Sequence, residues 1–244
     1  MPPTPYQHDR MAEELHTAIR LLKTGLRELS RLTAETDFFH LPILLLSSGF
    51  ERMMKTAICC YQLEATGEYP GRSDFARGKQ GHDLDRLLND VTRLCYSGDY
   101  LARISTSKAD LDFLRDDKKL RRIVRILSDF GLSARYYNLN VVLSEANPGP
   151  SPDDEWQQLE AEVLQEDPSW AARFDDWRQA DADIVRINTD LAVQCEKLAR
   201  SLSRLFAHGA LGSQAETISP YAFHFLKLTD DQLGKTDYGR IDVL

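Results

Sequence analysis

The sequence has no uninterrupted apolar segment of about 18 residues, which is the length that a membrane-spanning helix needs. Its first residues, Met-Pro-Pro-Thr-Pro, lack a basic region followed by an apolar one, so we expect no secretory signal. Cysteine is scarce, and no two cysteines form a C-x-x-C pair, which removes the main support for zinc-ribbon and thioredoxin classes. We expect free, buried thiols and a cytoplasmic protein that does not enter the membrane. The four cysteines are Cys59, Cys60, Cys95 and Cys195.

Several catalytic signatures are missing as well. The chain contains no G-x-S-x-G, no Walker loop, no G-x-G-x-x-G and no H-E-x-x-H. Serine hydrolases, P-loop NTPases, dinucleotide-binding enzymes and zincins therefore have no local support. The acidic stretch 151–183 has no EF-hand spacing and no His-x-x-x-His pair, so we expect no metal site and no cofactor.

Charge is unevenly distributed along the chain. The net charge is −8, but residues 151–183 hold eleven acidic and two basic residues, a local charge of −9 that leaves +1 for the rest. A polyanion site elsewhere is therefore compatible with the acidic total, although no broad basic face dominates. We interpret the acidic segment as a solvated face or as an electrostatic cover for a basic surface.

Apolar residues at spacings of three and four predict an all-α fold, a helical bundle with a long C-terminal helix and a helical insertion. The last helix has the clearest pattern and suits either a bundle core or a dimer seam. Its apolar stripe comprises Ile184, Ile187, Leu191, Cys195, Leu198, Leu202 and Leu205. The expected helices cover about 9–33, 42–63, 83–97, 108–130, 153–165 and 184–209, with a further one beginning near 168.

Other segments punctuate these helices. Residues 2–8 are typical of a proline-rich arm, 66–81 of a glycine-rich loop, and 147–152 of a linker. Gly131 suits a helix C-cap. Residues 133–144 could form either a short strand or a continuing helix, because periodicity does not decide so short a segment.

Three cationic side chains at the end of the long helix form the first candidate site. Arg200, Arg204 and His208 are four residues apart and share one helical face. Two guanidinium groups beside an imidazole could hold a phosphate and supply a proton. Alternatively, these cations only complement the negative end of the helix dipole.

The second candidate is a phosphate-binding turn between Arg77 and His82. The intervening residues, Gly-Lys-Gln-Gly, could present backbone amides to an anion. Alternatively, the glycines only make the turn and His82 begins the next helix.

Two further features allow contact with nucleic acid. Tyr136 and Tyr137 could stack on bases, although a buried aromatic pair is the interpretation we favour. A basic run is either a solvated helix face or a strip that contacts phosphates. This run comprises Arg115, Lys118, Lys119, Arg121, Arg122 and Arg125.

Two passages together carry a family resemblance. They are Leu-Leu-Ser-Ser-Gly-Phe-Glu-Arg-Met-Met-Lys, over 45–55, and Gly-His-Asp-Leu-x-x-Leu, over 81–87. This chain thereby resembles the HEPN superfamily, compact helical bundles that often dimerise and include many ribonucleases of toxin–antitoxin and defence systems. The resemblance covers 9–95 and 184–212 of a single domain spanning 1–244, and leaves 100–180 as an elaboration.

The resemblance also implies a site. Active members carry an Arg-polar-x-x-x-His motif late in the domain, which His208 and Gly209 match. Ser203 occupies the arginine position here, and Arg204 the polar one. It thus implies a metal-independent ribonuclease or RNA-binding protein using Arg204 and His208.

Two alternatives stand beside that reading. One is a non-catalytic scaffold that dimerises through its long helix or binds a protein partner. The other is a nucleotide-binding module that uses the turn between Arg77 and His82.

Overall fold

The computed structural model describes residues 3–33, 39–71, 75, 81–132, 136–143, 151–169 and 179–239. These residues form helices and contain no β-strand, so the all-α prediction is confirmed. The helices are α1 (Pro5–Leu29), α2 (His40–Thr66), α3 (Leu84–Leu94), α4 (Gly98–Arg103), α5 (Ser107–Asp116), α6 (Lys118–Leu132), α7 (Tyr137–Val142), α8 (Pro152–Gln165), α10 (Ala180–Ala207), α11 (Ser213–Ile218) and α12 (Phe223–Leu226), with 3-10 turns η4 (Ser219–Ala222) and η5 (Asp230–Gln232). None of them combines the length and apolar character that crossing a bilayer requires.

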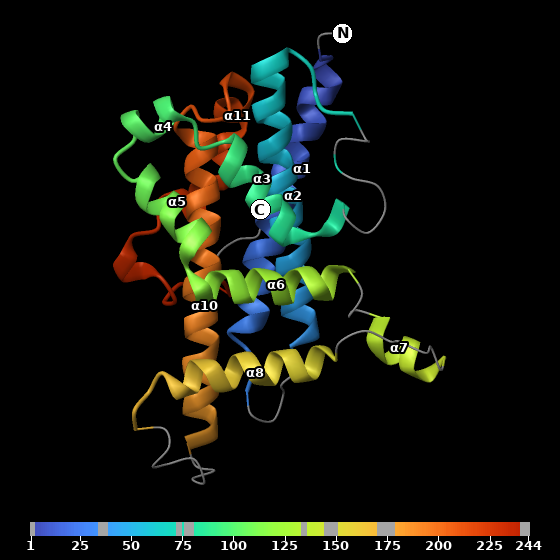
Figure 1. The fold of residues 1–244 in the computed structure, drawn as a ribbon, viewed down its shortest axis with the longest axis vertical. Helices are drawn as coiled ribbons and strands as arrows, with labels where there is room; N and C mark the ends of the chain where they lie inside the picture. Colours follow the sequence, from blue (N-terminus) through green and yellow to red (C-terminus); the bar gives the residue numbers. More distant parts are fainter. Residues whose placement is uncertain are drawn as a thin grey trace.

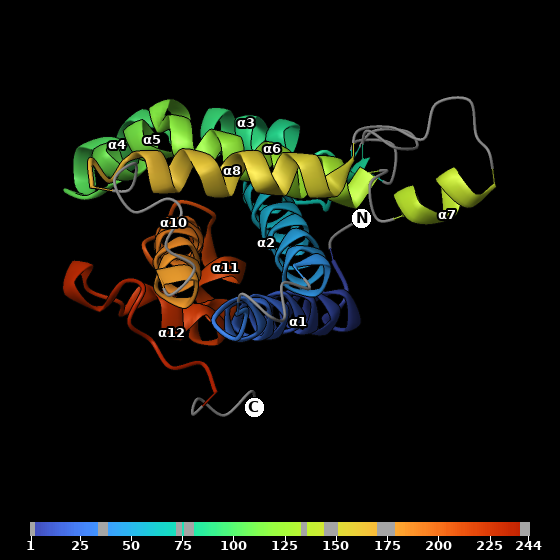
Figure 2. The ribbon, with the colours of Figure 1, turned by 90° about the horizontal axis from the view of Figure 1, so that it is seen from below.

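The helices lie in layers. Figure 1 shows α1, α2 and α10 running along the length of the molecule, while α6 and α8 cross them. In Figure 2, helices α3, α5, α6 and α8 cover one side of α2 and α10, and α1 and α12 lie on the other side. Helix α7 projects from the body in both views.

The long helix α10 supplies the centre of the core. Six of the seven residues in its predicted stripe are at most 2% exposed, and Ile184 is partly buried against them. Of the two interpretations of this stripe, the structure shows the bundle core. The stripe is therefore already buried within one chain and is not a free dimer seam.

Helices α1 and α2 approach closely at two glycines. A Cβ atom at Gly25 would lie 2.8 Å from Cγ of Leu46, and one at Gly49 would lie 2.8 Å from Cδ2 of Leu22. Each glycine thus faces a leucine of the other helix. Gly49, the glycine of the 45–55 passage, therefore has a packing role.

The N-terminal boundary of α1 differs from the prediction. The helix starts at Pro5, inside the expected arm, because Thr4 and Gln7 form a capping box. It ends at Leu29, before the predicted end near residue 33. The proline-rich composition was misleading, since proline in the first turn is compatible with a helix.

The predicted helix over 108–130 is two helices. Asp117 is extended between α5 and α6, and its carboxylate accepts a hydrogen bond of 2.8 Å from the amide of Leu120. It therefore caps α6, an interaction that hydrophobic spacing does not reveal. Gly131 lies inside α6, so its predicted role as a C-cap was wrong.

The remaining segments mostly agree with the sequence. Within 133–144, residues 137–142 are helical, which excludes the strand alternative there. Helix α8 begins at Pro152, capped by Ser151, close to the predicted 153. Residues 144–150, which hold most of the predicted linker, and 170–178, which hold most of the helix expected from 168, lie outside the described residues.

Candidate functional site

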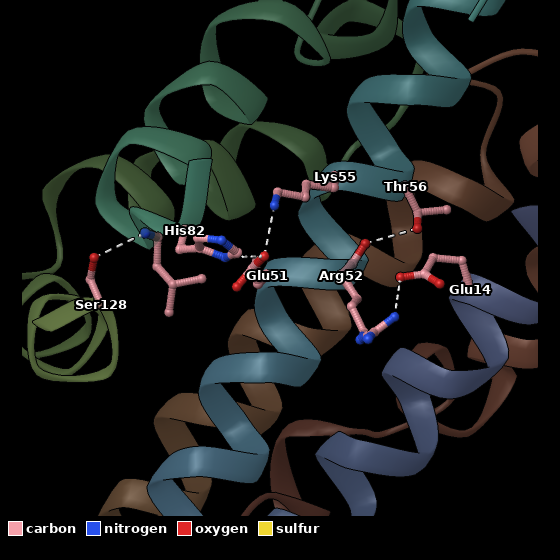
Figure 3. A network of polar contacts seen from close by, with 8 residues as sticks. Glu14, Glu51, Arg52, Lys55, Thr56, His82 and Ser128 are labelled. Carbon is pink, nitrogen blue, oxygen red and sulfur yellow. Dashed lines mark hydrogen bonds and ion pairs between the residues drawn. The ribbon is translucent and has the colours of Figure 1, made fainter. Parts of the chain in front are cut away.

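An imidazole, a carboxylate and an ammonium group meet between α2 and the start of α3. Nδ1 of His82 lies 2.9 Å from Oε1 of Glu51, and Nζ of Lys55 donates to the same oxygen at 2.7 Å. Figure 3 shows the three side chains converging across the two elements. We call Glu51, Lys55 and His82 the histidine cluster.

Local structure fixes the position of His82. The next residue, Asp83, caps α3 by accepting a hydrogen bond of 3.0 Å from the amide of Arg86. Ser128 of α6 donates to Asp83 at 3.3 Å and accepts a hydrogen bond of 3.0 Å from the amide of Leu84. His82 therefore stands at a helix start that is tied to a third helix.

The histidine cluster is anchored on one side and open on the other. The side chain of Glu51 is 19% exposed, whereas that of His82 is 53% exposed. A carboxylate beside Nδ1 favours the tautomer with the proton on Nδ1, which leaves Nε2 as a proton acceptor. Among the described residues, Nδ1 is the only side-chain atom of His82 with a hydrogen-bond partner. This arrangement is that of an oriented general base or acid.

A second ion pair of α2 lies on its opposite side. Arg52 contacts the carboxylate of Glu14 on α1, and the hydroxyl of Thr56 donates to the carbonyl oxygen of Arg52 at 2.8 Å (Figure 3). These contacts join α1 to α2 and do not include the histidine cluster. They offer a matched control for substitutions at Glu51.

The sequence identified only part of this cluster. His82 was a predicted site residue, but its predicted partner Arg77 lies outside the described residues. Glu51 and Lys55 belong to the passage that carries the family resemblance and have the spacing of a helical ion pair. Nothing local to the sequence indicated that His82 would contact Glu51, which lies 31 residues earlier in the chain.

Arg200 and Arg204 have partners inside the chain. Arg204 donates to Oδ1 of Asp110 at 2.7 Å. Arg200 donates to the carbonyl oxygen of Leu228 at 3.0 Å and to Asp230 at 2.6 Å. Both arginines are largely buried, and a buried guanidinium needs such partners to offset its lost hydration.

His208 stands apart from these two arginines. It is the C-cap of α10, and its carbonyl oxygen accepts a hydrogen bond of 3.1 Å from Arg103. The amide of His208 donates to the carbonyl oxygen of Arg204 at 3.0 Å, but in the described part of the chain no hydrogen bond or ion pair joins the His208 side chain to that of Arg200 or Arg204. The three side chains thus do not form one cluster in this structure, and their catalytic role stays a prediction.

Among the described residues, three of the six cations in the basic run, Lys119, Arg121 and Arg122, pair with acidic groups. On α6, Arg122 pairs with Glu155 at 2.9 Å, and Lys119 pairs with Glu166 at 2.7 Å and Asp190 at 3.0 Å. The acidic segment around α8 therefore acts as an electrostatic cover, one of the two predicted interpretations. These paired cations do not form a free strip for phosphates.

The aromatic pair differs from the favoured prediction. Tyr136 is exposed, so Tyr136 and Tyr137 are not a buried pair. Their neighbour Arg135 lies outside the described residues.

Comparisons with known proteins do not add a relative. No family model, no curated protein and no solved structure matches this chain. The described residues contain no group of three or more His, Cys, Asp or Glu side chains placed to hold a metal ion. The side chains of the chain itself therefore carry the functional evidence.

Proposed function

We propose that this chain is a HEPN-like ribonuclease that cleaves RNA without a metal ion and uses the histidine cluster as its site. The observation that supports this is the exposed imidazole of His82, held at Nδ1 by the mostly buried carboxylate of Glu51. The proposal keeps the predicted activity, including its setting in defence or a toxin–antitoxin system, and moves its centre from Arg204 and His208 to His82.

The chemistry follows from this geometry. Nε2 of His82 takes the proton of a ribose 2′-hydroxyl, whose oxygen attacks the adjacent phosphorus. The bond from phosphorus to the 5′-oxygen breaks, and the imidazolium returns the proton to that leaving oxygen. The products are a 2′,3′-cyclic phosphate and a 5′-hydroxyl, so protons and electrons balance. Glu51 stabilises the imidazolium, and Lys55 brings a positive charge near the phosphate.

The test is cleavage of a mixed RNA pool in EDTA by the native protein, by His82→Ala and by His208→Ala. We expect His82→Ala to lose cleavage by about 100-fold or more, which is the usual contribution of a general base. His208→Ala should cleave like the native protein. Loss of cleavage in His208→Ala alone would return the site to the end of α10, and no cleavage by folded native protein would reject the ribonuclease.

A second candidate function is a non-catalytic interaction module, which the exposed apolar surface of α7 favours. Leu139, Val141 and Val142 of α7 are exposed, as is the following Leu143, and the helix projects from the body (Figures 1 and 2). Since the stripe of α10 is buried, this surface is the better candidate for a homodimer contact. Sedimentation of the native protein and of Val142→Lys tests it: a native dimer that the substitution dissociates is expected, and a strict native monomer would reject it.

A further inference from the structure

A second polar site lies between α5, α10 and the C-terminal segment. A pocket of about 490 Å³ is bounded there by charged and apolar side chains of all three elements. Figure 1 shows α5 and the C-terminal segment to the left of α10, whereas α2 and α3 lie to its right. The lining includes Asp110, Lys197, Arg200, Ser201, Arg204 and Asp230.

Three cations of α10 face this pocket. Lys197, Arg200 and Arg204 are spaced by three and four residues, so they lie on one side of the helix. Nζ of Lys197 lies 4.5 Å from the ring centre of Phe113 on α5, which holds the ammonium group at the pocket wall. Two carboxylates, Asp110 and Asp230, oppose three cations, so the lining carries a net positive charge.

The buried part of this site has unused hydrogen-bonding capacity. Asp110 is 6% exposed and Arg200 is 7% exposed, yet Oδ2 of Asp110 and Nε of Arg200 have no hydrogen-bond partner. Outside the pocket lining, the hydroxyl groups of Tyr96 and Tyr100 are also buried without a partner, and the charge of Asp110 contributes, after burial itself, to raising the pKa of both tyrosines. Buried polar groups without a partner are uncommon in folded proteins, and a ligand or a bound water is one explanation for them.

The carboxylate of Asp230 lies at the exposed edge of the pocket, beside the cations of α10. It accepts a hydrogen bond of 2.6 Å from Arg200, but its own side chain is 88% exposed. The hydrogen bond and charge of Arg200, followed by the charges of Lys197 and Arg204, lower the pKa of Asp230. Asp230 is therefore an anion from the chain itself, bound by Arg200 at the rim of the pocket and near the charges of Lys197 and Arg204.

The segment that carries Asp230 is anchored independently of it. The carboxylate of Glu196, fully buried on α10, accepts hydrogen bonds of 2.6 Å from the amide of Gly234 and 2.6 Å from the hydroxyl of Tyr238. Loss of the Asp230 contact would thus leave the segment attached. Arg200 could then exchange one carboxylate for another anion without unfolding the C-terminus.

We propose that this pocket binds a small phosphomonoester, whose phosphate contacts Lys197, Arg200 and Arg204 in place of Asp230. The phosphate suits three clustered cations, two of them guanidiniums. The organic part suits the apolar wall of Ala109, Phe113, Val193 and Leu233, and the volume lies in the range of small-ligand sites. This site is separate from the histidine cluster and does not depend on the proposed ribonuclease activity.

Calorimetric titration of the full chain with inorganic phosphate and with the four ribonucleoside 5′-monophosphates tests the proposal. We expect at least one monophosphate to bind more tightly than inorganic phosphate. Asp230→Asn removes the competing charge and should tighten binding about threefold, the worth of an exposed ion pair. Lys197→Gln, which keeps its stem over Phe113, should weaken binding about tenfold.

Lys108→Gln on α5 is the matched control, since Lys108 pairs with exposed Asp112 and does not line the pocket. It should bind like the native protein. Unchanged or weaker binding in Asp230→Asn would overturn the proposal, because a purely structural ion pair predicts that result. The proposal would also be overturned if neither the folded native protein nor folded Asp230→Asn bound any probe. It would likewise be overturned if every monophosphate bound only as tightly as inorganic phosphate.

Discussion

The imidazole of His82 and the carboxylate of Glu51 are 2.9 Å apart although 31 residues separate them in the chain. His82 directly precedes the cap of α3, and Glu51 lies in the middle of α2. The packing of the two helices therefore sets the positions of both side chains. The same carboxylate oxygen accepts from Lys55. Glu51 therefore orients both of the other members of the cluster.

The first prediction concerns Glu51→Gln. Glutamine keeps the shape and the acceptor oxygen but removes the charge that stabilises the imidazolium and selects its tautomer. We expect RNA cleavage to fall by about 100-fold or more with little change in the unfolding midpoint, as for other carboxylate–histidine pairs. Single-turnover cleavage at saturating enzyme measures the effect.

The control is Glu14→Gln, because Glu14 pairs with Arg52 on the opposite side of α2. It should keep native cleavage. A native rate in Glu51→Gln, or an equal loss in both variants, would contradict the role assigned to Glu51.

Local pattern predicted the helices well and their long-range partners poorly. The α10 stripe consists of seven residues at spacings of three and four, and this spacing alone predicted that they would be buried. The interruption between α5 and α6 at Asp117 depends on one capping hydrogen bond, which the spacing of apolar residues does not predict. Arg204 meets Asp110 across 94 residues, a contact that depends on how α5 packs on α10. The sequence therefore pointed to His82 and Arg204 as candidates but not to the residues that each contacts, and the functional role of both stays a prediction.

The second prediction concerns the packing of α1 on α2. Gly25→Ala and Gly49→Ala should each lower the free energy of unfolding by about 1–3 kcal/mol, because the added methyl group overlaps a leucine of the facing helix. Urea unfolding followed by circular dichroism measures this. Gly98→Ala is the control, since no atom lies within 4 Å of its added Cβ, and it should be neutral or slightly stabilising.

The third prediction concerns the electrostatic cover of α6 by α8. A double-mutant cycle of Arg122→Gln and Glu155→Gln should give a coupling energy of about 1 kcal/mol, because both side chains are partly buried. The same cycle on Lys108 and Asp112, an exposed pair of one helix, should give less than about 0.5 kcal/mol. Equal coupling in the two cycles would mean that α8 is not held by these charges.

The last prediction concerns pH and the buried cysteines. Burial raises the pKa of Cys60 and Cys195 from the ordinary 9.0 to about 12, with smaller contributions from Cys59 and Glu196 respectively. The folded protein therefore keeps both thiols protonated where the unfolded chain releases protons. The stabilisation from these groups is complete below pH 9 and is lost between pH 9 and about 12, so the free energy of unfolding should fall with rising pH in that window.

Urea titrations at pH 8, 9.5 and 10.5 measure this decline, and Cys60→Ala with Cys195→Ala should make it shallower. The double variant will be less stable at every pH because each substitution leaves a small cavity, so the slope with pH is the quantity to compare. Ellman's reagent gives an independent reading: the thiols of Cys60 and Cys195 should react only after unfolding, since the thiolate is the nucleophile and the fold suppresses it. Rapid reaction of either thiol in the native protein at pH 8 would show that α2 or α10 opens, and the core assigned to these helices would then have to be revised.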